Sequence, residues 1–258
     1  MSLVLKPIYY LYEKFLERQV LKGIIPAHVA LILDGNRRYA KEMGFSDVSM
    51  GHKLGAQKVD ELLIWCAELN IKVVTIWVLS TDNIYREPEE LEKLLFIIES
   101  KLYDLSKNPM VKRYGYRIKI LGNTSILPVR LQEVVRIVEK STKDNKDRIL
   151  NIALGYGGRE EIIEAVKKAI LSKKTQNIEK IIEGLTTEDV GKYLYTYGIP
   201  DPDLIIRTSG EIRLSGFLLW QSAYSEFYFC DALWPAFRKI DFLRAIRSYQ
   251  HRKRRFGR

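Results

Sequence analysis

The sequence predicts a single α/β domain with a mostly parallel six-stranded sheet flanked by helices. Short apolar runs recur along the 258 residues, and stretches with helical spacing of apolar residues lie between them. Hydrophobic residues make up 47% of the chain and charged residues 29%, a balance that supports a sizeable core. The length allows for one or two domains, but no linker, internal repeat or low-complexity stretch divides the chain.

The predicted strands are continuous apolar runs, as is typical of parallel strands that are buried on both faces. They are expected at residues 28–33, 72–79, 117–121, 149–154, 204–208 and 226–229. Helices are expected between and after them, at residues 51–69, 89–106, 129–143, 159–171, 187–197 and 241–251. An acidic run at residues 87–92 is expected to be the solvated first turn of its helix.

An amphipathic helix is expected ahead of the first strand. Ile8, Leu11, Tyr12, Phe15 and Leu16 recur with helical spacing, and charged residues lie opposite them. Two interpretations stay open for this apolar face. It docks on its own domain or on a dimer mate, or it contacts a membrane surface.

Charge and hydropathy restrict the partners and the location of the protein. The formal net charge of +10 indicates a negatively charged partner, such as a nucleic acid, an anionic membrane or a phosphorylated substrate. No apolar run approaches the roughly 20 residues of a spanning helix, and the N-terminal residues do not resemble a signal peptide. Cys66 and Cys230 are isolated, which supports neither a disulfide framework nor a CxxC metal site. We therefore expect a soluble, cytoplasmic protein.

Polar residues follow the first predicted strand in a pattern that suits a phosphorylated ligand. Asp34, Gly35 and Asn36 turn the chain, and Arg37 and Arg38 then open a helix. Ligands of open α/β sheets bind beyond the carboxyl ends of the strands, and a helix N-terminus attracts phosphate. An arginine can clamp phosphate oxygens, and an aspartate can hold a divalent metal on a diphosphate. The alternative is that Asp34 only caps the helix and the arginines face solvent.

Two further clusters follow other predicted strands. The second contains Ser80, Asp82, Asn83 and Arg86, and the third contains Arg207, Glu211, Arg213 and Ser215. Clusters at the carboxyl ends of parallel strands meet at one rim of the sheet, and their arginines suit more than one phosphate group. Apolar residues near these clusters fit an apolar partner, although for each one by itself plain core packing is the preferred interpretation; they are Trp77, Leu79, Phe96, Ile98 and Trp220.

Several sequence blocks together resemble the ordered signature of the cis-prenyltransferases, the family of undecaprenyl and dolichyl diphosphate synthases. The blocks are HVALILDGNRRYAK, GHKLG, STDNIYREPEE, NIALGYGGRE, DLIIRTSGEIRLSGFLLWQSAYSEFYF and LWPAF, and they extend from about residue 28 to residue 237. The form DGNRRYAK is closer to archaeal and eukaryotic members than to bacterial ones. The resemblance implies an N-terminal helix in residues 1–25, a catalytic domain in residues 26–246 and a basic tail in residues 247–258.

The resemblance also implies a reaction. A homodimer would use Mg²⁺ to condense isopentenyl diphosphate onto an allylic diphosphate, farnesyl or geranylgeranyl, and would bind no nucleic acid. Asp34 would handle Mg²⁺ and help the allylic diphosphate leave, and Glu226 would be the second metal carboxylate. Asn83 is the proposed proton acceptor of the family. An amide is a poor base, however. The alternative that Asn83 positions a water, a phosphate oxygen or Asp34 therefore stays open.

The remaining site positions implied by the resemblance bind substrate. Arg255 and Gly257 match a C-terminal Arg-x-Gly that reaches into the partner subunit's site in related enzymes. The others are Gly35, Asn36, Arg37, Arg38, Tyr39, His52, Ser80, Thr81, Asp82, Ile84, Arg86, Arg207, Arg213, Leu214 and Ser215.

The chain departs from the family pattern at four places. No arginine lies between Gly44 and His52, where the family usually carries one that touches the allylic diphosphate. Ile84 replaces a frequent aromatic residue and Ala236 a frequent acid. Many long-chain members have a small residue where this chain has Val78. We expect a medium-to-long polyprenyl diphosphate, the precursor of a glycosyl carrier lipid.

Three other classes of protein explain the sequence less well. Prenyl synthases of the trans type use DDxxD motifs, and this chain contains none. The non-catalytic subunits of heteromeric dolichyl synthases lack the catalytic aspartate and the arginine clusters, which are present here. A nucleic-acid-binding module is indicated only by the net charge.

Overall fold

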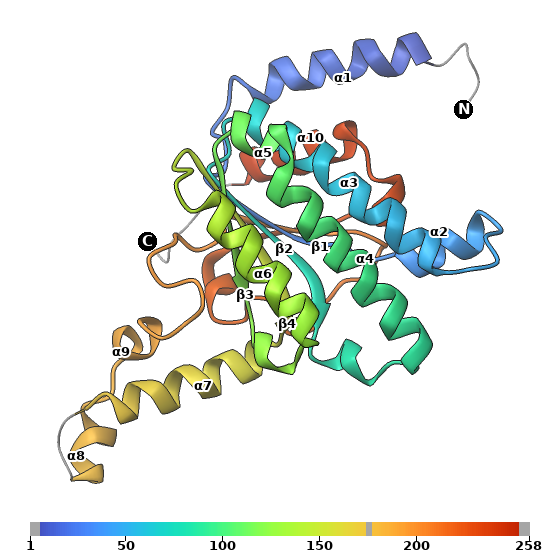
Figure 1. Cartoon of the computed structure of the whole chain (residues 1–258). Helices are drawn as coiled ribbons and strands as arrows, with labels where there is room; N and C mark the ends of the chain where they lie inside the picture. Colours follow the sequence, from blue (N-terminus) through green and yellow to red (C-terminus); the bar gives the residue numbers. More distant parts are fainter. Residues whose placement is uncertain (1–5, 174–176, 253–258) are drawn as a thin grey trace.

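A six-stranded sheet forms the centre of the computed structural model, which describes residues 6–173 and 177–252 (Figure 1). All neighbouring strands are parallel, in the order β3-β4-β2-β1-β5-β6. The strands are β1 (His28–Ile32), β2 (Val73–Ser80), β3 (Tyr116–Leu121), β4 (Arg148–Tyr156), β5 (Leu204–Arg207) and β6 (Glu226–Phe229). Every predicted strand is present with bounds that differ by at most two residues, so the predicted fold class is confirmed.

Helices cover the sheet and connect its strands. They are α1 (Lys6–Val20), α2 (Asn36–Glu42), α3 (Ser49–Glu68), α4 (Pro88–Lys107), α5 (Pro109–Arg113), α6 (Val129–Thr142), α7 (Gly158–Leu171), α8 (Ile178–Glu183), α9 (Thr187–Gly191) and α10 (Lys239–His251). Short 3₁₀ helices are η2 (Asp82–Tyr85), η3 (Thr124–Ile126), η4 (Gln221–Tyr224) and η5 (Trp234–Ala236). The sequence did not predict α5, α8 or the 3₁₀ helices, because segments of three to six residues show no helical periodicity.

Helix α9 is shorter than the helix predicted over residues 187–197. It ends at Gly191, and the chain continues in single turns such as the one closed by Leu194 N–H on the carbonyl of Gly191. The amide of Tyr195, which would continue the helix, instead donates to Oε1 of buried Glu161 at 2.8 Å. A tertiary hydrogen bond therefore replaces the helical one.

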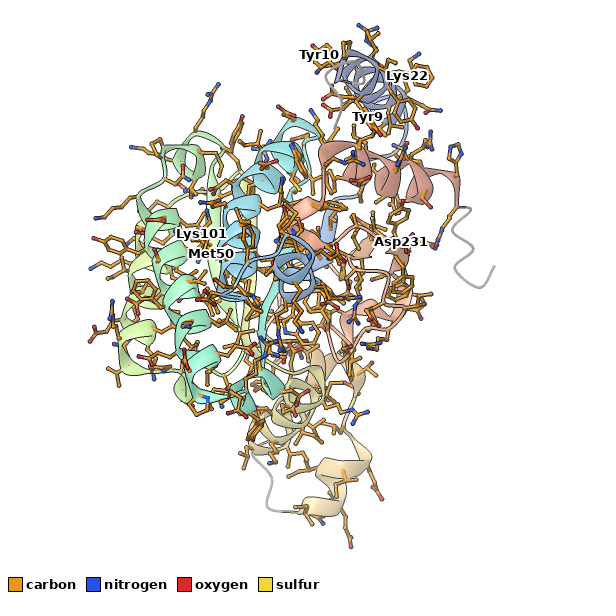
Figure 2. The ribbon with its side chains drawn as sticks, turned by 90° about the vertical axis from the view of Figure 1, so that its right-hand side faces the viewer. Tyr9, Tyr10, Lys22, Met50, Lys101 and Asp231 are labelled. Carbon is orange, nitrogen blue, oxygen red and sulfur yellow. The ribbon has the colours of Figure 1, made fainter. Side chains whose placement is uncertain are left out.

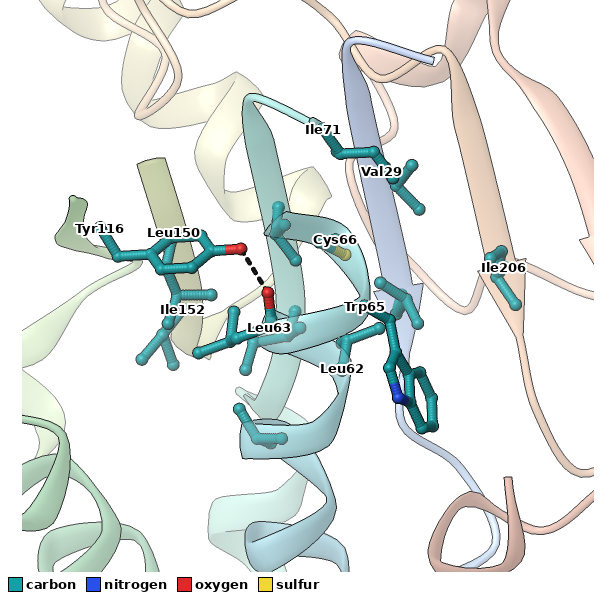
Figure 3. Close-up of a cluster of buried hydrophobic side chains, with 14 of the residues drawn as sticks. Val29, Leu62, Leu63, Trp65, Cys66, Ile71, Tyr116, Leu150, Ile152 and Ile206 are labelled. Carbon is teal, nitrogen blue, oxygen red and sulfur yellow. Dashed lines mark hydrogen bonds between the residues drawn. The ribbon is translucent and has the colours of Figure 1, made fainter. Parts of the chain in front are cut away.

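The core lies on both faces of the sheet, because successive residues of a strand point to opposite faces. Val29 and Leu31 of β1 belong to the larger cluster, under α3, α4, α6 and α10. Ala30 and Ile32 belong to a second cluster on the other face, with Tyr156 and Phe217. Figure 3 shows part of the larger cluster, where the buried hydroxyl of Tyr116 donates to the carbonyl of Leu63 at 2.7 Å.

Helix α1 packs on α10 at one end of the molecule (Figure 1). Leu16 and Val20 are fully buried there, and Lys239 of α10 donates to Glu17 at 2.7 Å. Figure 2 shows Tyr9 on the side of α1 toward α10, where Arg238 lies 5.5 Å from its ring, and Tyr10 on the outer side. The predicted apolar face is therefore divided: Leu16 and, in part, Tyr12 dock on the domain, whereas Ile8, Leu11 and Phe15 are each at least 60% exposed.

Among the described residues, no helix is both long enough and apolar enough to cross a bilayer.

Candidate active site

Asp34 lies at the carboxyl end of β1, in a tight turn into α2. Its Oδ1 accepts a hydrogen bond from Gly35 N–H at 2.7 Å, and its Oδ2 accepts one from Arg207 at 2.8 Å. Gly35 has φ 106° and faces Leu233, so a side chain at this position would be strained and obstructed. Burial acts to raise the pKa of Asp34, but the hydrogen bonds from Arg207, Ser209 and Gly35, together with the charge of Arg207, outweigh it, and the net pKa is lowered. Asp34 is thus an ionised carboxylate at neutral pH.

The GHKLG block explains why α3 can lie so close to this turn. A Cβ atom on Gly51 would lie 2.0 Å from the carbonyl oxygen of Asn36, and one on Gly55 would lie 2.1 Å from its side-chain Oδ1. Trp234 fixes the same region by donating its indole N–H to the carbonyl of Gly55 at 2.8 Å. Helix α3 therefore packs directly against the turn and the start of α2, through contacts that only glycine permits.

Arg207 joins the first cluster to the third. It is 5% exposed at the end of β5, next to β1 in the sheet. Besides Asp34, its guanidinium donates to Ser215 Oγ at 2.9 Å and to the carbonyl of Arg213. One buried cation thereby fixes the carboxylate of β1 and the loop after β5 in a single arrangement.

Two carboxylates pair with the other arginines of the site. Glu211 contacts Arg38 at 3.5 Å and also pairs with Arg213. Glu90, in the first turn of α4, contacts Arg86 at 3.0 Å and Arg37 at 3.5 Å. The prediction that the whole acidic run is merely solvated was therefore wrong for Glu90, whose side chain is only 20% exposed. Acidic residues in a first helical turn are common, so the sequence carried no signal for this role.

Ser80 and Asn83 form a reciprocal pair at the end of β2. The amide of Ser80 donates to Asn83 Oδ1, and the amide of Asn83 donates to Ser80 Oγ, both at 3.1 Å. This pair fixes the side chain of Asn83 at the start of η2. Because its Oδ1 already accepts a hydrogen bond, its free capacity is mainly the two N–H donors of the amide.

The three clusters line one cavity of about 510 Å³, which we call the charged mouth. Lys41, which the sequence places in the same helix as Arg37 and Arg38, also lines it. The predicted site residues that line the charged mouth are Asp34, Gly35, Asn36, Arg37, Arg38, His52, Ser80, Asp82, Asn83, Arg86, Arg207 and Ser215.

A second, apolar cavity of about 80 Å³ adjoins the charged mouth, and we call it the apolar channel. Leu33, Asn36, His52, Trp77, Val78 and Leu94 line both. The other side chains around the channel come chiefly from α3, α4 and the sheet, among them Val59, Ile76, Ile98, Leu102 and Leu105. The pairing of β2 with β4 is irregular between Trp77 and Leu79, which turns Val78 toward this space. The charged mouth therefore opens directly into an apolar interior.

His52 lies at the boundary between the two cavities. Its Nε2 is buried, and the described residues offer it no hydrogen-bond partner. Burial, and to a lesser extent the charge of Arg86, lowers the pKa of His52 to about 4. The imidazole is therefore neutral at physiological pH.

The remaining predicted positions lie elsewhere. Four of them do not line the charged mouth: Tyr39, Thr81, Ile84 and Leu214. Arg213 does not line it either, but its carbonyl accepts a hydrogen bond from Arg207 and its side chain pairs with Glu211. Of the apolar candidates, Trp77 and Ile98 line the cavities, Leu79 is fully buried, Trp220 packs near α7 and α9, and Phe96 is 59% exposed. Arg255 and Gly257 lie outside the described residues.

Glu226 is placed at the other end of the sheet. It begins β6 and pairs in register with Leu204, the first residue of β5, whereas Asp34 follows the last residues of β1. Its carboxylate contacts Arg252 at 2.7 Å. A single chain therefore does not bring Glu226 beside Asp34, and its role as a metal ligand stays a prediction.

Comparison with known proteins identifies this arrangement. Residues 32–257 match the family described as "Putative undecaprenyl diphosphate synthase". The chain belongs to the cis-prenyltransferase family. It is 52% identical to an isoprenyl transferase of Thermus thermophilus, covering 98% of this chain and 97% of that one. It is 51% identical to a (2Z,6E)-farnesyl diphosphate synthase of Thermobifida fusca, with both chains covered in full.

A solved structure supports the same assignment. Lavandulyl diphosphate synthase from Lavandula x intermedia, in complex with dimethylallyl diphosphate, superposes with a TM-score of 0.83 at 36% identity. The match covers 91% of this chain and 99% of the plant enzyme. The resemblance seen in the sequence blocks is therefore confirmed, and this cis-prenyltransferase is an enzyme that transfers prenyl groups.

Proposed function

We propose that this cis-prenyltransferase condenses isopentenyl diphosphate onto an allylic diphosphate, with Mg²⁺, to make a polyprenyl diphosphate. The observation that carries the proposal is the junction of the charged mouth with the apolar channel. One ligand with a diphosphate at one end and a hydrocarbon chain at the other fits both.

The arginines supply two regions for diphosphate. Arg37 and Arg38 follow the turn after β1, and Arg207 and Arg213 lie on and after β5. We assign the first region to the allylic diphosphate and the second to isopentenyl diphosphate. Glu90 and Glu211 hold the exposed arginines in place until a diphosphate competes for them.

Asp34 fits a magnesium ion that is bound mainly by its substrate. Mg²⁺ usually takes one or two protein carboxylates and fills its shell with phosphate oxygens and waters. The described residues hold no cluster of three acidic, histidine or cysteine ligands, which suits such a site better than an all-protein cage. When bound, the ion would neutralise charge that builds on the departing diphosphate.

The other groups of the site stabilise charge and exclude water. Charge on the leaving diphosphate would be balanced by Arg37 and Arg38, and the cationic character of the allylic carbon would be protected by Trp77, Val78 and Leu94. Because Oδ1 of Asn83 accepts from Ser80, we favour Asn83 as a donor that positions a substrate oxygen. The proton of the incoming five-carbon unit then passes to a diphosphate oxygen, since ionised Asp34 is a weak base.

Incorporation of radiolabelled isopentenyl diphosphate tests the proposal. Wild-type protein should extend farnesyl or geranylgeranyl diphosphate in the presence of Mg²⁺, and chelation of the metal should stop turnover. Asp34→Ala should be inactive yet fold with an unchanged circular dichroism spectrum. Incorporation by Asp34→Ala at the wild-type rate would refute the assigned role.

Two features support partners for the enzyme. Strand β6 is an edge strand whose residues, including Phe227 and Tyr228, are only half-buried, which suits a homodimer. Light scattering should give twice the mass of one chain. Exposed Ile8, Leu11 and Phe15 on α1 suit a peripheral contact with an anionic membrane.

A further inference from the structure

One charged side chain, Lys101, lies in the wall of the apolar channel and is paired with a carboxylate behind that wall. Lys101 of α4 lines the channel beside Ile98, Leu102 and Leu105, and its Nζ donates to Asp60 Oδ2 of α3 at 2.6 Å. The Lys101 side chain is 15% exposed, and the side chain of Asp60, which does not line the channel, is 36% exposed. The second carboxylate oxygen of Asp60 is buried, without a hydrogen-bond partner among the described residues. A carboxylate with one buried, unpaired oxygen is costly to stability, so this ion pair calls for a functional explanation.

Lys101 lies well inside the channel, and Asp60 lies beside it on α3. Helices α3 and α4 both start at the charged mouth, where His52 and Leu94 line its boundary, and they run side by side over the sheet (Figure 1). Asp60 follows His52 by eight residues and Lys101 follows Leu94 by seven, which places both about two helical turns, or roughly 11 Å, from the mouth. The two side chains therefore meet at one depth.

The channel is too small for a grown prenyl chain unless its walls separate. Its volume of about 80 Å³ is below the roughly 150 Å³ of a cavity that holds one benzene molecule. One wall is the central sheet, represented by Ile76 and Ile152, and the others are α3 and α4. Strands in the middle of a sheet are fixed by their neighbours on both sides. The channel can therefore widen only if α3 and α4 move apart.

The Asp60–Lys101 pair opposes this movement. Among residues 6–173 and 177–252, no other ion pair joins α3 to α4. Partial burial strengthens the attraction relative to a surface pair. A hydrocarbon chain that passed this depth would also lie against the charge of Lys101 and displace water from it without offering a hydrogen bond in return.

We propose that the Asp60–Lys101 pair is the length-determining constriction of the channel, which limits how far the prenyl chain of the product extends between α3 and α4. The inference rests on the proposed function, because it assumes that the channel receives the growing chain. It concerns the property on which relatives differ, since the matched family is described as undecaprenyl diphosphate synthase and a 51% identical relative as a farnesyl diphosphate synthase.

Product analysis tests the constriction. Lys101→Met keeps the aliphatic stem and removes the charge, and Asp60→Asn keeps the shape of the carboxylate without its charge. Each variant should shift the main dephosphorylated product by at least one five-carbon unit toward longer chains. The double variant should shift it no further than the stronger single variant, because both changes remove the same pair.

Arg130→Met is the matched control. It removes an ion pair of 2.7 Å between Arg130 of α6 and Glu99 of the same helix α4, outside the lining of the channel. Its products should match those of the wild type. An unchanged product distribution in Lys101→Met and Asp60→Asn, or an equal shift in Arg130→Met, would overturn the constriction.

A binding measurement separates this inference from the proposed function. Trp77 and Trp234 line the channel, so tryptophan fluorescence reports ligands that enter it. Geranylgeraniol should bind Lys101→Met about tenfold more tightly than the wild type, as expected if two further methylene groups are buried, whereas geraniol should bind both equally. Equal affinities for geranylgeraniol would refute the constriction even in an active enzyme. Failure of the wild type to incorporate isopentenyl diphosphate would refute the proposed function. The difference in geranylgeraniol affinity would still show whether the Asp60–Lys101 pair constricts the channel.

Discussion

Arg207 shows how much of the site depends on one buried side chain. It connects Asp34, 173 residues earlier in the chain, with Ser215 and the carbonyl of Arg213. The sequence predicted that all these residues belong to one site, because each follows a strand end. It could not predict that Arg207 is the buried connector while Arg37 and Arg38 are exposed, since burial depends on the order of strands in the sheet.

Replacing Arg207 by lysine should reduce kcat/KM by about 10²-fold, the scale of losing one charge-stabilising donor. Lysine keeps the charge but cannot donate to three acceptors in a planar fork. Steady-state kinetics with varied isopentenyl diphosphate would measure the effect. Arg117→Lys, at an exposed position of β3, is the control and should leave kcat/KM unchanged. Activity of Arg207→Lys within a factor of two of this control would contradict the assigned role.

His28 makes the stability of the fold depend on pH. It is fully buried, with one ring nitrogen 2.7 Å from the carbonyl of Pro200 and the other 2.8 Å from Thr75 Oγ1. Burial lowers the pKa of His28 to about 4. Because the unfolded chain binds a proton near pH 6.5, the contribution of neutral His28 is complete above that pH and is lost as pH falls toward 4.

The unfolding free energy of the wild type should therefore fall more between pH 7 and pH 4.5 than that of His28→Asn. The expected difference is about 2 kcal/mol, and urea denaturation at the two pH values measures it. His52, whose pKa is also lowered, contributes equally to both proteins and cancels. The same pH dependence in both would show that His28 is not kept neutral by the fold.

At the scale of elements, the long strands and helices were predictable and the short ones were not. Buried parallel strands are continuous apolar runs, and helices of thirteen or more residues show their period, as α10 does. By contrast, α5 and α8 contain five and six residues, and α9 ends where Glu161 takes the amide of Tyr195. The contact of α3 with α2 is also tertiary: the sequence shows Gly51 and Gly55 but not that Asn36 lies against them.

Gly51→Ala should separate α3 from the turn that carries Asp34. Alanine favours a helix over glycine by up to about 1 kcal/mol, but its Cβ would lie 2.0 Å from the carbonyl oxygen of Asn36. A backbone atom cannot move aside as a flexible side chain can, so we expect a net loss of about 1–3 kcal/mol in stability. Displacement of the turn should lower kcat by about 10²-fold. Thermal unfolding and initial rates would measure both effects.

The control for this change is Gly191→Ala. Gly191 lies in α9 and has open space where a Cβ would be. Alanine should therefore be neutral or slightly stabilising at this position, and activity should not change. If Gly51→Ala behaved like Gly191→Ala, the close packing of α3 on the turn would not matter for the site.

At the scale of the whole molecule, the surface of α1 is the feature that the sequence left most open. Its periodicity predicted one apolar face, but of that face the fold fully buries only Leu16 and packs Tyr12 partly against the core and Arg244 of α10. Ile8, Leu11 and Phe15 stay exposed, and Arg18 and Lys22 lie on the same segment. A helix with an exposed apolar stripe beside basic residues, on a protein of net charge +10, suits the surface of an anionic bilayer.

Wild-type protein should therefore co-sediment with vesicles that contain anionic lipid, and less so with neutral vesicles or at high salt. Leu11→Glu and Phe15→Glu should each weaken this binding by about tenfold, because a charge in the apolar stripe opposes its burial in the interface. Both residues are more than 60% exposed, so the fold and the turnover of a short soluble substrate should not change. Leu171→Glu, at an 83% exposed position on α7, controls for added negative charge and should bind like the wild type. Equal vesicle binding by Leu11→Glu and Leu171→Glu would show that the attraction depends on net charge alone. The apolar stripe of α1 would then be assigned to contact with a second copy of the chain.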